Sequence, residues 1–154
     1  MNDTSPGYLR IIPLILVALT ALASPAFSED IKALTRKAES GDPEAQYMLG
    51  NAYYCGTMVQ RNYSEAVKWY RRAAEQEDPD APVMLAIAYE EGNGVPMDDM
   101  HAYVWYSIAA SRRPGSDYAN YPRWRDDAGK KLTPDQLVKA QQMTREWEAK
   151  HPRK

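Results

Sequence analysis

Cysteine is almost absent from the 154-residue sequence, in which Cys55 is the one example. A single thiol cannot form a disulfide within the chain, so the sequence excludes a fold held together by disulfides and a zinc site built from cysteine pairs. In an oxidising compartment such a thiol is shielded, free or joined to another molecule. The fold must therefore be stabilised by its hydrophobic core.

Histidine is nearly as scarce, because His101 and His151 are the two examples. Neither lies in a metal-binding H-E-x-x-H pattern, and the chain has no G-x-S-x-G or S-x-x-K motif that would supply an activated serine. We therefore expect no catalytic residues, no metal ion and no cofactor, and we expect that the protein is not an enzyme.

The densest group of carboxylates surrounds the loop GNGVPM and contains Glu90, Glu91, Asp98 and Asp99. Carboxylate oxygens are the ligands that calcium prefers, but the spacing here does not match an EF-hand loop. Helix capping by Asp98, with solvated neighbours, is the preferred interpretation.

A strong charge of either sign is also missing. The chain has 19 Lys and Arg against 21 Asp and Glu, which gives a net charge of −2. Without a basic field to attract phosphates, a nucleic-acid partner is not expected.

An apolar, uncharged run extends over residues 11–23 and follows Arg10. The run is shorter than the roughly 20 residues that a membrane-spanning helix needs, and it has the length of a signal-peptide core. Ala26 and Ser28 then supply small residues at the spacing that a signal peptidase requires, with Ala21 and Ala23 as a second possibility. Residues 1–28 are predicted to be a signal peptide, so the mature chain would be periplasmic or secreted. An uncleaved leader that anchors the chain is the alternative.

The chain repeats itself with a period of 36 residues. The identical pairs begin at Ala45/Ala81 and end at Ala74/Ala110, and Asp42-Pro43 likewise recurs as Asp78-Pro79. Between these limits they include Leu49/Leu85, Ala52/Ala88, Tyr53/Tyr89, Gly56/Gly92, Val59/Val95, Ala66/Ala102, Trp69/Trp105, Tyr70/Tyr106 and Ala73/Ala109. A fixed period of this length indicates stacked structural units that bury a shared core.

Each unit has the pattern of two amphipathic helices. Positions 45, 49, 52, 53 and 56 lie on one helical stripe, and positions 66, 69, 70, 73 and 74 lie on another. Asp42 with Pro43, and Asn62 with Glu65, are typical helix starts, and Asp98 occupies the position of Asn62 in the second unit. Gly56 and Gly92 suit helix ends. The small alanines let helices approach, while Trp69 and Trp105 are predicted to be buried in equivalent places between helix pairs.

These residues resemble the Sel1-like repeat, a relative of the tetratricopeptide repeat. The resemblance is carried by AQYMLGNAYYCG and AVKWYRRAA in the first unit, and by APVMLAIAYEEGNGV and AYVWYSIAA in the second. It implies an all-α fold, a short right-handed α-solenoid of antiparallel helix pairs with terminal capping helices. Met58 departs from the pattern at a connector glycine, and Pro82 is expected to delay the second unit's first helix to Asp80 or beyond.

The expected organisation is a signal peptide over 1–28, an N-terminal capping helix over 29–41, repeats over 42–77 and 78–113, and a C-terminal part over 114–154. In this last part, residues 116–131 are predicted to form a degenerate first helix of a third unit, interrupted by Pro122. Thr133-Pro134-Asp135-Gln136 predicts the start of a final helix that ends near Ala149. This helix is expected to bury Leu137, Ala140, Met143 and Trp147.

We call the first helix of each unit its opening helix. One face of each opening helix lies outside the stripe of residues that pack in the core. It contains Tyr47, Asn51 and Tyr54 in the first unit, and Val83, Ile87 and Glu90 in the second. In related solenoids such helices line the concave side, so these six residues form the predicted protein-binding face. For Val83 and Ile87, contacts between neighbouring opening helices are the alternative. A second candidate is the segment with Arg112, Arg113, Tyr118, Tyr121, Arg123, Trp124 and Arg125, which is interpreted first as a helix-packing face with exposed arginines.

The resemblance implies an exported adaptor or regulator whose partner is a protein or peptide, with membrane contact only through that partner or an uncleaved leader. The alternative is an envelope-associated ligand receptor or a weak hydrolase, since some cysteine-rich relatives are described as penicillin-binding or β-lactamase-like. Their helix-pair disulfides are not possible here, because Cys55 has no partner in the chain.

The export hypothesis predicts that the mature protein begins near Glu29. N-terminal sequencing of the protein from its native host measures this directly. Recovery of an intact Met1 in a soluble cytosolic fraction would contradict it.

Overall fold

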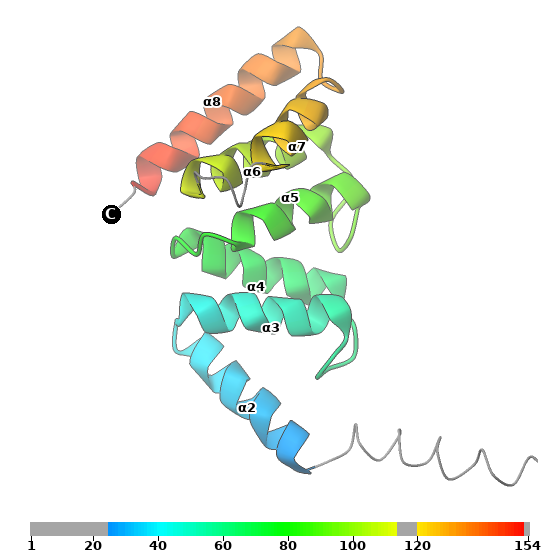
Figure 1. The fold of residues 1–154 in the computed structure, drawn as a ribbon, viewed down its shortest axis with the longest axis vertical. Coiled ribbons are helices and arrows are strands. Elements are labelled where there is room, and N and C mark those ends of the chain that lie inside the picture. The colour runs from blue at the N-terminus through cyan, green and yellow to red at the C-terminus, as the bar shows by residue number, and fades with distance from the viewer. Residues whose placement is uncertain (1–24, 114–119, 153–154) are drawn as a thin grey trace, which may run out of the picture.

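The computed structural model describes residues 25–113 and 120–152, which form seven α-helices and no strand (Figure 1). Residues 1–24 of the signal peptide expected over 1–28 lie outside the described residues, as does Tyr118. The helices are α2 (Pro25–Glu39), α3 (Pro43–Cys55), α4 (Tyr63–Glu75), α5 (Ala81–Glu91), α6 (Asp99–Arg112), α7 (Asn120–Gly129) and α8 (Pro134–Lys150). The predicted all-helical solenoid is confirmed.

From α2 to α7 each helix packs against the next, and α8 packs back on α6. The pairs α3/α4 and α5/α6 correspond to the two sequence repeats, and α4 packs on α5 to join them. Figure 1 shows these four helices lying one above the other, with α2 at one end of the stack and α8 at the other. Helix α2 begins at Pro25, upstream of the expected cleavage point, so cleavage before Glu29 would leave Glu29–Glu39 as the capping helix.

The predicted helix starts are occupied by side-chain caps. Asp42 accepts the backbone N–H of Ala45 at 2.8 Å, and Asp98 accepts those of Met100 and His101 at 2.9 and 3.0 Å. At α8 the full capping box forms between Thr133 and Gln136. These bonds satisfy N–H groups that the first helical turn leaves without a partner inside the helix.

The predicted start of α4 at Asn62 and Glu65 has the residues of a capping box, but only half of the box forms. Asn62 accepts the N–H of Glu65 at 3.1 Å, but the Glu65 carboxylate binds Lys68. At the other end of the opening helices, Gly56 and Gly92 have φ values of +69° and +73°. This left-handed conformation is costly for residues with a Cβ atom, so both glycines end their helices as expected.

Pro82 has the predicted effect on the second repeat. Helix α5 begins at Ala81, and the Asp78 carboxylate accepts the N–H groups of Asp80 at 3.0 Å and Ala81 at 2.8 Å. Pro122, by contrast, does not interrupt α7, which begins at Asn120. The expected interruption was wrong because Pro122 lies in the first turn, where its missing N–H would have no helical partner anyway.

The core is built mainly from alanines that lie between helices. Those with at most 1% exposure are Ala38, Ala66, Ala73, Ala74, Ala81, Ala86, Ala88, Ala102, Ala109, Ala128 and Ala140. Leu49, Tyr70, Leu85 and Ile108 fill the larger spaces between them. Small side chains bring the helix backbones together, and each large one then fills a gap that two neighbouring helices share.

Trp69 and Trp105 occupy equivalent places, as the repeat predicts. Trp69 packs with Ala38, Ala45 and Leu49. Trp105 packs against the cluster that contains Ala74, Ala81 and Leu85, which are the residues 36 positions further on. The two differ in burial: Trp69 is 8% exposed, whereas Trp105 is only half-buried, so the prediction that both are buried is wrong for Trp105. Trp105 also meets Trp147 of α8 edge-on, with ring centroids 5.8 Å apart.

Helix α8 closes the C-terminal end by packing on α6. Ala140 is fully buried with Val104 and Ile108, and Met143 and Trp147 pack on this cluster while remaining half-buried. Leu137 is also half-buried. The predicted apolar stripe of α8 is therefore partly covered.

Trp69→Ala is expected to destabilise the fold by about 3–5 kcal/mol, because it empties a filled space between α2, α3 and α4. Trp105→Ala is expected to cost less, since that ring is already partly hydrated. Urea denaturation followed by circular dichroism measures both. Equal midpoints for Trp69→Ala and the parent chain would show that the tryptophan does not hold these helices together.

Candidate protein-binding face

The six predicted binding residues lie on α3 and α5, but they differ in accessibility. Tyr47, Asn51, Tyr54, Ile87 and Glu90 are half-buried. Val83 is 8% exposed and belongs to the cluster that joins α5, α6 and α7. The assignment of Val83 to an exposed face is therefore corrected: packing between neighbouring opening helices, the alternative interpretation, describes it. Ile87 packs on the edge of the same cluster.

Asn51 has a structural partner in the core. Its Oδ1 accepts the hydroxyl of Tyr70 at 2.8 Å, and Tyr70 is fully buried. Burial raises the pKa of Tyr70 above its usual value, so the hydroxyl stays protonated and donates. The ring lies so close to Gly50 that an added Cβ would stand 2.6 Å from a ring carbon. Asn51 thus satisfies a buried donor, which the sequence interpretation missed.

Tyr54 joins the ends of the two opening helices. Its ring meets Tyr63 edge-on at a centroid distance of 5.1 Å. Its hydroxyl donates to Glu91 at 3.2 Å and accepts from Asn93 Nδ2 at 3.3 Å. Burial is the main cause that raises the pKa of Tyr54, with the nearby Glu91 carboxylate acting in the same direction. The ring is held in place from both repeats and still keeps part of its surface accessible.

Glu90 is held in an ion-paired network rather than left free. Its carboxylate accepts the Tyr106 hydroxyl at 2.7 Å and Lys131 Nζ at 3.0 Å, while Lys131 also reaches Asp99 at 3.2 Å. Burial alone would raise the pKa of Glu90, but the bonds from Tyr106 and Lys131 outweigh it and hold the pKa below its usual value. A carboxylate with a lowered folded-state pKa stabilises the fold at neutral pH, and this contribution is lost as the pH falls through that pKa.

Trp124 of α7 belongs to the same face, although sequence reasoning placed it in a separate segment. Its ring lies 5.9 Å from Tyr106 and 5.5 Å from Tyr121, and it remains 38% exposed. Since Tyr106 donates to Glu90, contacts run without a break from α5 to α7. We call the surface of α3, α5 and α7 with Tyr47, Tyr54, Ile87, Glu90, Tyr121 and Trp124 the opening-helix face.

The arginines of the second candidate segment are engaged within the chain. Arg123 lies 3.9 Å from Asp127, and Arg125 lies 2.6 Å from Asp126. Arg113 pairs with Asp80 at 2.6 Å. The segment therefore contributes aromatic surface to the opening-helix face more than uncompensated positive charge.

The family model of the Sel1 repeat matches residues 43–78 and 79–113, which are α3 with α4 and α5 with α6. The chain contains two Sel1 repeats. Compared with the expected repeats over 42–77 and 78–113, the start of each repeat and the end of the first lie one residue later, and the second ends at residue 113 as expected. Sel1 repeats generally mediate protein–protein interactions.

Two solved structures with this fold resemble the chain. A protective antigen of uropathogenic Escherichia coli that displays an SLR fold is 31% identical, with a TM-score of 0.71 over 78% of this chain and 25% of that one. A Sel1 repeat protein from Oxalobacter formigenes is 35% identical, with a TM-score of 0.57 over 63% of this chain and 27% of that one. The chain thus spans about a quarter of each relative. Comparison with curated proteins gives no match.

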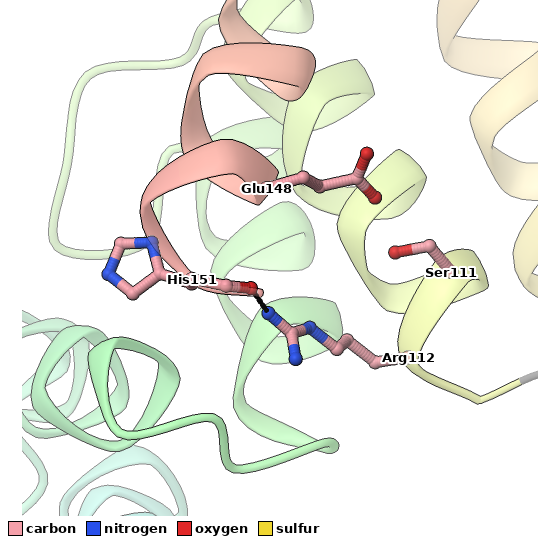
Figure 2. A pocket seen from close by; sticks show the side chains of 4 residues that line it. All are labelled: Ser111, Arg112, Glu148 and His151. Carbon is pink, nitrogen blue, oxygen red and sulfur yellow. Dashed lines mark hydrogen bonds between the residues drawn. The ribbon is translucent and has the colours of Figure 1, made fainter. Parts of the chain in front are cut away.

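A small pocket of about 220 Å³ lies between the end of α6, in the second Sel1 repeat, and the end of α8 (Figure 2). It is lined by Ser111, Arg112, Glu148 and His151, which invites comparison with a hydrolase. Ser111 Oγ donates to the Ile108 carbonyl at 3.0 Å, while the His151 ring stacks on Trp147 and points away from Ser111 in Figure 2. Serine and histidine are therefore not placed as nucleophile and base.

Arg112 links the end of α6 to the end of α8. It donates to the His151 carbonyl at the end of α8, and its guanidinium lies over the Trp147 ring, 5.1 Å from the centroid. A cation at a helix C-terminus and above an indole ring is favourable on both counts. These contacts fasten the last turn of α8 to α6.

The part of the chain that the structure describes holds no cluster of three potential metal ligands. Asp98, one of the four carboxylates considered for calcium, caps α6 as predicted and also contacts the His101 ring at 2.7 Å. No described helix has the length and apolar character needed to cross a bilayer. Cys55 is exposed.

Asn51→Ala is expected to destabilise the first Sel1 repeat by about 1–3 kcal/mol, because it leaves the buried Tyr70 hydroxyl without its acceptor. The double variant Asn51→Ala/Tyr70→Phe removes donor and acceptor together and should recover much of that loss. Urea denaturation of both single variants and the double variant measures the coupling. Strictly additive changes in the free energy of unfolding would show that the bond between Asn51 and Tyr70 does not contribute to stability.

Proposed function

We propose that this Sel1-repeat protein is an exported adaptor that binds a protein or peptide along the opening-helix face. The observation that carries the proposal is a set of partly exposed aromatic rings on the opening-helix face, Tyr47 and Tyr54 in the first repeat and Tyr121 and Trp124 in α7. Aromatic side chains dominate the energy of many protein interfaces, because they bury a large surface.

The rings are also preorganised. Tyr54 is bonded to Glu91 and Asn93, and Trp124 rests on Tyr106, whose hydroxyl is bonded to Glu90. A ring that is already fixed loses little conformational entropy when a partner covers it. The face can therefore supply affinity without rearranging its own core.

The proposed location is the periplasm or the extracellular space. Support comes from the sequence, in which the short apolar run over 11–23 precedes small residues at the cleavage spacing. A partner in the cell envelope follows from this location, and membrane contact would come only through that partner or an uncleaved leader.

Photocrosslinking tests the face directly. A benzoylphenylalanine residue is placed at Trp124 or Tyr47 in the full-length chain and produced in the native host, with the same residue at Val138 as a matched control. Val138 is 62% exposed and lies on α8, outside the opening-helix face. Adducts of one defined mass are expected from positions 124 and 47 after irradiation, because both side chains would be covered by the partner.

Position 138 should give no such adduct. If Val138 forms the same adduct while positions 47 and 124 form none, the partner binds the outer surface of the stack and the proposed face is wrong. Trp124→Ala supplies a second measurement, since loss of an aromatic anchor is expected to weaken partner binding by about 2 kcal/mol or more.

A further inference from the structure

A groove of about 370 Å³ lies beside the opening-helix face, where the start of α3 approaches the segment that leads into α5. Its apolar surface comes from Tyr47 and Met48 of α3 and from Pro79. Met48 is 51% exposed, so its apolar surface is accessible to a partner. The groove thus offers an apolar wall.

Carboxylates surround this wall. Glu44, Asp78 and Asp80 line the groove, and the one cation among its described lining residues is Arg113. Arg113 pairs with Asp80, and Asp78 accepts the N–H groups of Asp80 and Ala81. Three carboxylates against one guanidinium leave the groove with an excess of negative charge, and Glu44 is exposed at its edge.

On the rest of the opening-helix face, Glu90 shares Lys131 with Asp99, and Glu91 bonds to Tyr54 and Asn93, so negative charge is present there too. What the groove adds is an excess of negative charge directly beside the exposed apolar surface of Met48. An aliphatic stem that ends in a cation complements both features, because the stem packs on Tyr47 and Met48 while its head group reaches Glu44.

We propose that the groove receives a lysine or arginine side chain of the partner, carried on a segment with apolar residues next to it. This inference rests on the proposed function, since it specifies the chemistry of the partner that the opening-helix face binds. The rings at Tyr54 and Trp124 would hold the apolar residues, and the groove would select the basic one and fix the register of the segment.

Selection from a random dodecapeptide library, displayed on phage and applied to the intact chain, tests this chemistry. The enriched peptides are expected to carry a lysine or arginine adjacent to apolar residues. Synthetic copies are then titrated by fluorescence polarisation. Glu44→Lys should weaken their binding about tenfold, because it places a like charge beside the peptide's cation, and Met48→Gln should weaken it several-fold.

Asp135→Lys is the matched control. Asp135, like Glu44, is an exposed acidic residue in the first turn of a helix, but it lies in α8 outside the groove. It should leave peptide binding unchanged. A peptide whose basic residue is replaced by glutamate should bind Glu44→Lys more tightly than it binds the parent chain, which a general loss of folding could not produce.

The outcomes separate this inference from the proposed function. Peptides that lack a basic residue, or that lose affinity on Trp124→Ala but not on Glu44→Lys, would overturn the groove proposal and leave the adaptor face in place. Enrichment of acidic peptides would also overturn it. A selection that yields no binder, or only binders insensitive to both substitutions, would count against the opening-helix face and would overturn both proposals.

Discussion

The close approach of successive helices is the constraint on which the rest of the structure depends. Alanines at the contact positions of α3, α4, α5 and α6 are almost completely buried, so each helix backbone can lie directly against the next. A stack held this way has little space inside it, and each aromatic residue has one place where it fits. The positions of the binding residues follow from that fit.

The two repeats place the equivalent buried tyrosines, Tyr70 and Tyr106, in different ways. In the first, Gly50 allows the Tyr70 ring to press against α3 and its hydroxyl to reach Asn51. In the second, alanine stands at the equivalent position 86, and the Tyr106 hydroxyl bonds to Glu90 instead. The change from Gly50 to Ala86 thus accompanies a change in the acceptor of the tyrosine hydroxyl, from the Asn51 amide to the Glu90 carboxylate. The Glu90 carboxylate also binds Lys131.

This difference shapes the proposed binding face. The Glu90 network ties α5 to Lys131, shortly after α7, and Lys131 is shared with Asp99. At the groove, Glu44, Asp78 and Asp80 are met by a single guanidinium, that of Arg113. A partner would therefore meet aromatic surface over Tyr54 and Trp124 and a negative field at the groove. Rings supply affinity in such an arrangement, and charge supplies selectivity and register.

The sequence by itself determined the helices, their order and their pairing. The 36-residue period fixed which positions are equivalent, and the caps at Asp42, Asp98 and Thr133 marked helix starts, because these signals act over a few residues of one chain segment. Only the tertiary structure decided what the side chains on the remaining face do. Asn51 was expected to face a partner but satisfies Tyr70, and Val83 is covered by α6 and α7. Trp124 joins the face through Tyr106, and the groove forms only where α3, the α5 entry and Arg113 meet. Periodicity says which way a residue points from its own helix, but accessibility depends on the neighbouring helices, whose distance and angle arise from packing across the whole stack.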